Sequence, residues 1–290
     1  MMGCSASAAL DSAIHVNEAR IEKYKAERLA TRKPATVNRE LAALRRAFAL
    51  AVKQRRISAA PHISMLAENN ARQGFAEPGD FEAIVSHMPG YLQGFARFAY
   101  ASGWRKGELK TLGWSAVDKD NTRITLRREY SKNGEPRVIP LVGELQEIIE
   151  RQRRQREYKT PSGETALSRY VFHRAGHPIG DFRKTWTAAC IEAGFAQPKI
   201  GRDGQPVLAA DGEPVLKAAL IFHDLRRSAV RNLDRDGITQ SVAMAITGHK
   251  TASIYRRYRI VNEDDIRIAL ERVQSGNRAR KVVRLQTASG

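Results

Sequence analysis

The first quarter of the chain carries apolar residues with the period of a helix. After Pro34 they recur at steps of four, three, four and four: Val37, Leu41, Leu44, Phe48 and Val52. This spacing puts the five side chains on one face, because an α-helix has about 3.6 residues per turn. The pattern predicts an amphipathic helix over residues 33–56 that packs against a small core.

The same predicted helix is basic at many of its other positions. Residues 1–72 contain 13 Lys and Arg against six Asp and Glu. A solvated face of an ordinary helix would explain this charge, and so would a helix that contacts phosphate with its polar side. We expect a small helical DNA-binding domain over residues 1–72. Its candidate DNA-binding residues are Arg39, Arg45, Arg46, Lys53 and Arg55.

A cluster of Asn, Gly and Pro predicts a linker near residues 70–78, and the chain beyond it is mainly helical in pattern. A second domain is expected over residues 73–275, followed by a tail at 276–290 that has basic but no acidic residues. We expect this tail to be flexible and to touch DNA. The predicted helices lie at about 79–87, 90–102, 105–112, 143–157, 181–193, 224–236, 239–247 and 262–273.

Two short segments have the alternating pattern of strands rather than of helices. Residues 123–127 and 137–141 flank the sequence Ser131-Lys132-Asn133-Gly134. Asn-Gly between two such segments is a strong signal for a hairpin turn, so Lys132 is predicted to lie at a hairpin tip. The predicted fold class is therefore mainly α with a small antiparallel β-sheet. Residues 196–217 contain two similar segments with Asp-Gly turns eight residues apart, which predicts an inserted β-excursion without an assigned function.

Composition narrows the class of partner. The formal net charge is +18 and the pI about 10.3, which favours a polyanion as partner, although a ribosomal or merely soluble basic protein has the same balance. No apolar run approaches the roughly 20 residues of a membrane span, and the N-terminus does not resemble a signal peptide. The two cysteines, Cys4 and Cys190, indicate neither a disulfide framework nor a thiolate zinc site and fit a reducing cytoplasm.

Four separate segments carry residues suited to chemistry. They contain Arg105, Lys132, the pair His223 and Arg226, and His249 followed nine residues later by Tyr258. Taken singly, each has an ordinary interpretation: an exposed helix arginine, a solvated hairpin lysine, a helix start, a helix C-cap or a core aromatic. Only their joint occurrence in one order is informative.

That order, Arg … Lys … His-x-x-Arg … Gly-His … Tyr, resembles the catalytic signature of the tyrosine recombinases, or phage integrases. The resemblance covers residues from about 33 to 273. It implies a SAM-like core-DNA-binding domain over 1–72 and a tyrosine-recombinase catalytic domain over 73–275. Arm-type domains precede this pair in many phage integrases. None is expected here and the first domain looks short, so the chain is either a minimal recombinase or the product of a truncated gene start.

The chemistry of the set is coherent. When a phosphodiester is broken without a metal, the extra negative charge of the transition state needs fixed positive charge beside it. Arg105 and Arg226 can supply that charge. A tyrosine hydroxyl can store the bond energy in a covalent link, and Lys132 is the candidate acid for the leaving 5′ oxygen. His223 and His249 can each accept the tyrosine proton or bond a phosphate oxygen.

The resemblance also implies the roles of the two histidines and the choice of tyrosine, which the residues alone leave open. It implies that His223 is the general base, that His249 donates to the phosphate, and that Tyr258 is the nucleophile. Tyr255 lies three residues before Tyr258, on roughly the same helix face, and physical reasoning from the sequence does not choose between the two. No cofactor, ATP or metal is expected.

Metal-dependent alternatives are weaker. His173 and His177 have zinc-like spacing, but Gly176 and Pro178 break any helix there and no third ligand is evident. Two acidic groups could suggest a two-metal nuclease: Asp118 with Asp120, and Glu263 with Asp264 and Asp265. The second group follows Asn262 and is typical of a helix start. That last helix has an apolar face, which would dock either on a neighbouring subunit, as the resemblance implies, or within its own chain.

The resemblance implies a site-specific recombinase of a mobile element that cuts and rejoins double-stranded DNA through a 3′-phosphotyrosyl link. Four protomers would bind two sites in the cytoplasm, at the nucleoid, with accessory DNA-bending or directionality proteins left open. Two rival functions remain at this point. One is a type IB-like topoisomerase, and the other is a catalytically inactive, DNA-binding relic of a mobile element.

Overall fold

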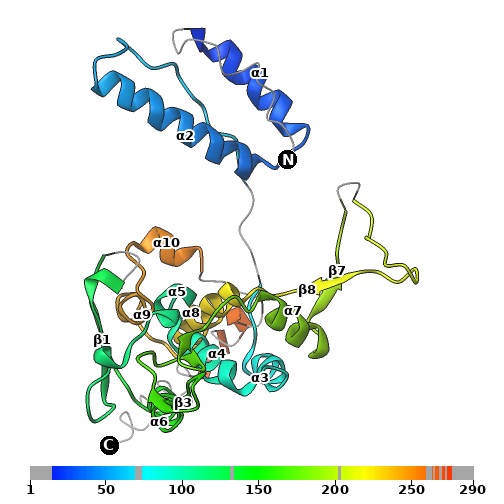
Figure 1. Ribbon diagram of the computed structural model, residues 1–290. Helices are drawn as coiled ribbons and strands as arrows, with labels where there is room; N and C mark the ends of the chain where they lie inside the picture. The colour runs from blue at the N-terminus through cyan, green and yellow to red at the C-terminus, as the bar shows by residue number, and fades with distance from the viewer. Residues whose placement is uncertain are drawn as a thin grey trace, which may run out of the picture. The chain divides into compact units, whose positions relative to one another are not determined.

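The chain divides into two compact units, Met1–Arg72 and Gln73–Gly290 (Figure 1). The computed structural model describes residues 15–68, 74–130, 134–201 and 204–258, and helical residues 263, 265–267, 270–271 and 273–275 near the C-terminus. Across these described ranges, no helix has the length and apolar character that crossing a membrane requires.

The first unit is a pair of packed helices. They are α1 (Glu18–Leu29) and α2 (Pro34–Lys53). Asn17 caps α1 by accepting a hydrogen bond from the backbone of Arg20 at 3.0 Å, and Pro34 begins α2, where its missing N–H costs nothing. The core of this unit contains three of the five residues of the predicted stripe of α2, Val37, Leu41 and Phe48, and Leu44 packs against it. The core also contains Ile21 and Ile63.

The sequence-based prediction differs from this unit in two respects. Helix α1 was not predicted individually, and α2 ends at Lys53 instead of residue 56. Arg55, just beyond α2, has a positive φ of 55° and cannot continue the helix. Residues after α2 return to pack on the helices, where Asn38 holds the backbone of Leu66 through two hydrogen bonds of 2.8 and 2.9 Å.

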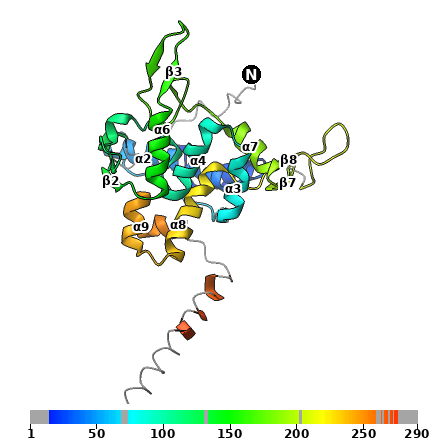
Figure 2. The same cartoon turned by 90° about the horizontal axis from the view of Figure 1, so that it is seen from below.

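Eight helices of the second unit lie within residues 74–258 (Figures 1 and 2). Helix α4 lies at the centre and packs against α3, α6 and α8. Its residues Leu92, Phe95, Phe98 and Ala99 are all buried in the core of the unit. The bounds are α3 (Pro78–Ser86), α4 (Gly90–Ser102), α5 (Lys106–Lys110), α6 (Glu144–Arg154), α7 (Arg183–Glu192), α8 (Leu225–Arg235), α9 (Gln240–Thr247) and α10 (Ala252–Arg256).

The strands of the described residues form four separate two-stranded antiparallel sheets. The fold class is therefore mainly α with small antiparallel sheets, as predicted, but the sheets are several and only one of these hairpins was expected strand by strand. The pairs are β1 (Arg123–Leu126) with β2 (Arg137–Pro140), β3 (Glu157–Lys159) with β4 (Thr165–Leu167), β5 (His173–Arg174) with β6 (His177–Pro178), and β7 (Ala196–Pro198) with β8 (Leu216–Ala218).

The β1–β2 hairpin joins the two segments that were predicted as strands. Arg123 pairs with Pro140 and Leu126 with Arg137, so the register is centred between residues 131 and 132. Residues 131–133, which include Asn133, lie outside the described part of the chain, so the Asn-Gly turn stays a prediction. Lys132 itself lies outside the described residues.

The predicted insertion forms a β-excursion that projects from the helices beyond β7 and β8 in both views (Figures 1 and 2). Its base is closed by a ring of three backbone hydrogen bonds of 2.7–2.8 Å among Lys199, Val207 and Val215. Each of the two arms between them turns at a glycine with φ near +80°, a backbone conformation that favours glycine.

The predicted linker at 70–78 is too long. Ala76 is buried, and its N–H donates to Oγ of Ser228 at 2.9 Å, so residues 74–77 belong to the second unit. Residues 69–73 and the predicted tail at 276–290 lie outside the described part of the chain.

Candidate active site

Two helices end at the same place, and each ends in a glycine. Gly103 closes α4 with φ +64°, and Gly248 closes α9 with φ +70°. Both conformations are left-handed, which glycine adopts without strain. A Cβ at Gly103 would approach Ala229 and Thr247 to 3.0 Å, so glycine also permits α4 to end close to α8 and α9.

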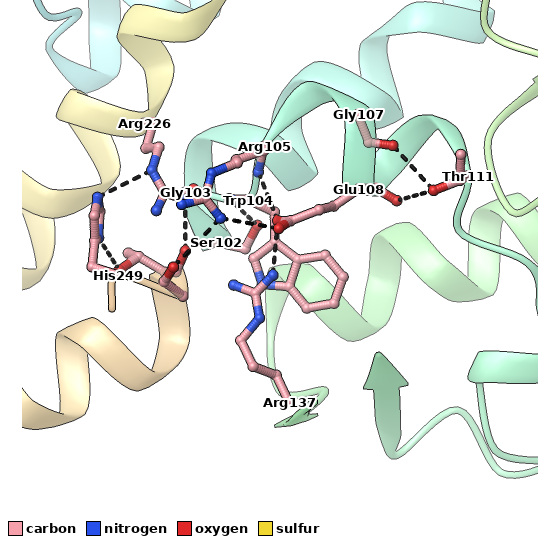
Figure 3. Close-up of polar contacts among 12 residues, drawn as sticks. Ser102, Gly103, Trp104, Arg105, Gly107, Glu108, Thr111, Arg137, Arg226 and His249 are labelled. Atoms are coloured by element: carbon pink, nitrogen blue, oxygen red, sulfur yellow. Dashed lines mark hydrogen bonds and ion pairs between the residues drawn. The ribbon is translucent and has the colours of Figure 1, made fainter. Parts of the chain in front are cut away.

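Arg226, in the first turn of α8, fills the space between these two helix ends (Figure 3). Its side chain is 2% exposed. Nη1 donates to the carbonyl oxygens of Gly103 and Thr247, the latter at 2.6 Å, and Nε donates to Nε2 of His249 at 3.1 Å. Helix C-termini carry partial negative charge, which offsets part of the cost of burying the cation. Burial and the charge of Arg105 lower the pKa of Arg226, but an arginine stays protonated at neutral pH.

One donor of Arg226 is left over. Nη2 is buried and has no hydrogen-bond partner among the described residues. A buried donor without a partner costs free energy, which a ligand that accepts from it would recover. An anionic oxygen is the strongest such acceptor.

Arg105 lies at the N-cap of α5 and is held by a buried carboxylate. Its Nη1 donates to Oε1 of Glu108, and its backbone N–H donates to Oε2, each at 3.1 Å. The same Nη1 lies 3.5 Å from the carbonyl oxygen of Gly248. Burial alone would raise the pKa of Glu108, but Arg137 and Arg105 hold that pKa below its usual value. Glu108 is therefore ionised and fixes the orientation of Arg105.

The hydrogen bonds of His249 determine its tautomer. Nε of Arg226 can only donate, so Nε2 of His249 accepts and the proton resides on Nδ1. Nδ1 donates to Oγ1 of Thr247 at 2.7 Å, and that hydroxyl donates to the carbonyl of Ala243. Burial and the charges of Arg226, Arg105 and Arg137 lower the pKa of His249 to about 3. In this arrangement the imidazole is neutral and has no N–H free for a phosphate.

His223 and Tyr258 meet at one edge of the site. Nε2 of His223 lies 3.2 Å from Oη of Tyr258. The tyrosine ring also faces the guanidinium groups of Arg226 and Arg227, whose central carbons lie 5.5 and 5.4 Å from its centroid. Partial desolvation and the charges of these arginines lower the pKa of His223. A neutral imidazole at hydrogen-bond distance from a phenol can accept its proton.

The structure separates the two candidate tyrosines. Tyr255 is 1% exposed and belongs to a small core with Val230 and Ala243, whereas Tyr258 is partly exposed and reaches His223. Helix α10 ends at Arg256, so the two side chains do not continue along one helix face.

The other sequence candidates lie elsewhere or outside the described residues. The five basic candidates of the first unit are on α2 or just after it, and all five are exposed. His173 is bonded to the carbonyl of Gln155 at 3.0 Å, and Asp265 pairs with Arg231 and Arg235 at 2.8 and 2.7 Å. No group of three or more potential metal ligands occurs among the residues that the structure describes.

Sequence reasoning missed three residues that organise the site: Glu108, Thr247 and Arg137. Glu108 stands three positions after Arg105, which is the spacing of a capping box and was a usable signal. Thr247 and Arg137 had no such signal, because their roles depend on residues far away in the chain. Two guanidinium groups, a neutral imidazole and a phenol hydroxyl together suit transfer of a phosphoryl group to a tyrosine.

A sequence model described as the Phage integrase family matches residues 77–264. Among solved structures, a lambda integrase dimer bound to a COC′ core site is similar with a TM-score of 0.63 and 18% identity, over 86% of this chain and 82% of that one. The Tn1549 transposon integrase with circular intermediate DNA has a TM-score of 0.60 and 16% identity, over 88% and 85% of the two chains. A lambda integrase tetramer bound to a Holliday junction has a TM-score of 0.62 and 18% identity, over 85% and 65%. No curated protein sequence matches.

Proposed function

The chain belongs to the phage integrase family of tyrosine recombinases, and on this premise we propose that Tyr258 is the nucleophile with which it cuts and rejoins DNA. The observation that carries the proposal is the 3.2 Å contact between Oη of Tyr258 and Nε2 of His223. Buried Arg226 faces the same tyrosine ring, and its Nη2 has no hydrogen-bond partner among the described residues. This arrangement supports the proposal because an attacking oxygen, a base and a hydrogen-bond donor for a phosphate oxygen lie together.

In the proposed reaction, Oη of Tyr258 attacks the scissile phosphorus while the bond from phosphorus to the 5′ oxygen breaks. The tyrosine proton passes to Nε2 of His223, which is neutral because its pKa is lowered. The products are a 3′-phosphotyrosyl link and a free 5′-hydroxyl group. Attack by a 5′-hydroxyl on this link reverses the step, so rejoining consumes no ATP.

Arg105 and Arg226 are proposed to hold the non-bridging oxygens of the phosphate. Both guanidinium groups are fixed before substrate arrives, Arg105 by Glu108 and Arg226 by two helix-end carbonyls. Donors fixed in advance stabilise the additional negative charge of the transition state without reorganising. Lys132 remains the proposed acid for the 5′ oxygen, from its place in the motif and the chemistry of the step.

His249 requires a revised proposal. The sequence-based hypothesis made it a phosphate donor, but as described it accepts from Arg226 and donates to Thr247. We propose that it first positions Arg226. An approaching phosphate raises the pKa of a nearby imidazole, so His249 would become a donor only after gaining a proton.

The first unit is proposed to bind the DNA backbone. Arg39, Arg45, Arg46, Lys53 and Arg55 lie at its surface, while the apolar face of α2 is occupied by the core of the unit. Because these basic side chains take no part in the core, they can contact phosphate without disturbing the fold. This supports residues 1–72 as a DNA-binding domain and 73–275 as the catalytic domain.

The assembly proposed for this chain is a tetramer on two paired DNA sites, by analogy with the lambda integrase tetramer bound to a Holliday junction. We further propose that it recombines DNA of a mobile element at the nucleoid in the cytoplasm, where its substrate would lie. Accessory DNA-bending or directionality proteins are compatible with this proposal and are not required by it.

The test is to trap the covalent intermediate. The full chain is incubated with a pool of nicked duplexes whose core is randomised, in excess EDTA, and the adducts are isolated under denaturing conditions and sequenced. We expect a tyrosine-linked adduct on a defined core sequence. Absence of any adduct, or an adduct that needs Mg²⁺, would contradict the proposed mechanism.

A further inference from the structure

Arg137, the first residue of β2, is a buried cation that the proposed reaction does not use. Its side chain is 9% exposed. Nη2 pairs with Oε2 of Glu108 at 2.7 Å, and the guanidinium lies over the ring of Trp104 with its central carbon 4.8 Å from the centroid (Figure 3). On another side it lies against Gly248, where an added Cβ would overlap Nη1 of Arg137.

Glu108 links Arg137 directly to Arg105. One oxygen of the carboxylate accepts from Nη1 of Arg105, and the other accepts from both the Arg105 backbone and Arg137. With two cations on one carboxylate, the direction in which Glu108 points depends on both. Removing Arg137 would release one side of Glu108 and leave Arg105 with a carboxylate that is free to turn.

The guanidinium of Arg137 is itself held between rigid groups. The indole of Trp104 is anchored by its own hydrogen bond from Nε1 to the carbonyl of Ile246 at 3.1 Å. Gly248, which the guanidinium also approaches, is the C-cap of α9. A flat guanidinium can stack on the indole and bond a carboxylate edge at once, which the compact ammonium of a lysine cannot.

Stability alone does not account for this arrangement. Nε and Nη1 of Arg137 are buried without hydrogen-bond partners among the described residues. Buried donors of this kind destabilise a fold, and a buried ion pair is often no better for stability than an apolar pair of the same size. The residue therefore has a cost that a functional gain would explain.

We propose that Arg137 is a positioning residue of the cleavage step, which acts by holding Glu108 and, through it, the guanidinium of Arg105. The inference rests on the proposed role of Arg105 at the scissile phosphate. Arg137 does not touch the DNA in this proposal. Its loss reduces the rate of bond breaking, because misplacing a catalytic group by about 1 Å can cost about 100-fold.

The experiment measures single-turnover adduct formation by the full chain on one nicked duplex recovered from the randomised pool. DNA affinity and the temperature of unfolding are measured in parallel. The variants are Arg137→Met, Arg137→Lys, Arg105→Lys and the double variant Arg105→Lys with Arg137→Met. The matched control is Arg123→Met: Arg123 is in the partner strand β1 and also faces a carboxylate, Asp118 at 3.7 Å, but its side chain is 65% exposed.

We expect both Arg137 variants to slow adduct formation by about 10- to 100-fold with little change in DNA affinity, and Arg123→Met to react like the wild type. In the Arg105→Lys background, Arg137→Met should cost less than about threefold, because residues that act through one another are not additive. Should Arg137→Met fail to fold, Arg137→Lys, which keeps the charge, supports the same comparison with its own double variant.

Three results would overturn the inference. If Arg137→Met forms the adduct at the wild-type rate, Arg137 has no positioning role. If its slower adduct formation is explained by weaker affinity for DNA, Arg137 acts in DNA binding instead. An equal loss in both backgrounds shows that Arg137 acts independently of Arg105. A wild-type rate for Arg105→Lys instead rejects the proposed function of Arg105, so the two failures are distinguishable.

Discussion

Oη of Tyr258 and Nε2 of His223 lie 3.2 Å apart although 35 positions separate the two residues in the chain. His223 comes from a short 3₁₀-helix, Phe222–Asp224, that leads into α8, and Tyr258 comes from the turn after α10. The contact joins the proposed nucleophile to a neutral imidazole, which makes the identity of the tyrosine and the state of the histidine directly testable.

The first prediction separates the two tyrosines. Tyr258→Phe removes the hydroxyl and keeps the ring that faces Arg226 and Arg227, so folding and DNA binding should persist while the covalent adduct disappears. Tyr255→Phe, its matched control in the small core, should retain most of the adduct. Denaturing gels of the nicked-duplex reaction measure both. An adduct formed by Tyr258→Phe and lost in Tyr255→Phe would identify Tyr255 as the nucleophile.

The second prediction concerns pH. A base must be unprotonated, and the pKa of His223 lies below its usual value of about 6.5 because of partial desolvation and the charges of Arg226 and Arg227. Adduct formation should therefore stay constant from about pH 8 to below about 6.5 and fall only under more acidic conditions.

The control for the pH profile is His223→Gln, which cannot take the proton. It should slow adduct formation by about 100-fold or more and remove this acidic limb from the rate profile. Single-turnover rates across the pH range, measured at subsaturating protein so that they report the pKa of the DNA-free protein, provide the measurement. A midpoint above about 6.5, or an acidic limb retained in His223→Gln, would show that another group is the base.

The third prediction compares two glycines. Gly248→Ala forces a side chain into a left-handed conformation, with its Cβ overlapping Nη1 of Arg137. We expect a loss of about 2 kcal/mol or more in the free energy of unfolding, together with a large loss of adduct. Gly107→Ala, in α5 and with nothing within 4 Å of the added Cβ, should be neutral or slightly stabilising. Urea unfolding checks both, and equal effects would contradict the steric argument.

The fourth prediction concerns the first unit. Replacing Arg45, Arg46 and Arg55 with Gln should weaken DNA binding and flatten its dependence on salt, by about 0.9 in the log–log slope for each phosphate that is no longer neutralised. A control that replaces three exposed basic residues of the catalytic unit, Arg151, Arg154 and Lys159, removes the same net charge. Binding titrations at several salt concentrations give the slopes. Equal flattening by both triple variants would point to net charge, not to phosphate binding by α2.

Local pattern was sufficient for most of the helices. The stripe from Val37 to Phe48 and the left-handed C-cap at Gly103 depend on neighbours within a few residues, so their positions could be predicted. The same locality explains the errors. The helix predicted over residues 33–56 ends instead at Lys53, because the chain after it turns back to pack on the two helices, and the local pattern carries no information about that contact.

The candidate site could be predicted as a set of residue types in order, but not as an arrangement. The resemblance to the tyrosine recombinases pointed to Arg105, His223, Arg226, His249 and Tyr258, and the structure brings these five residues to one place. Their electrostatic states could not be predicted, because they depend on burial and on charges brought close by the fold.

Only the tertiary structure decided which tyrosine reaches His223 and which is buried. A spacing of three residues would place both tyrosines on one face of a continuous helix, but α10 ends at Arg256, between them. It also decided that His249 is neutral and bonded to Thr247, and that Glu108 joins Arg105 to Arg137. These relationships depend on burial and on contacts between segments far apart in the chain, and local periodicity carries no information about either.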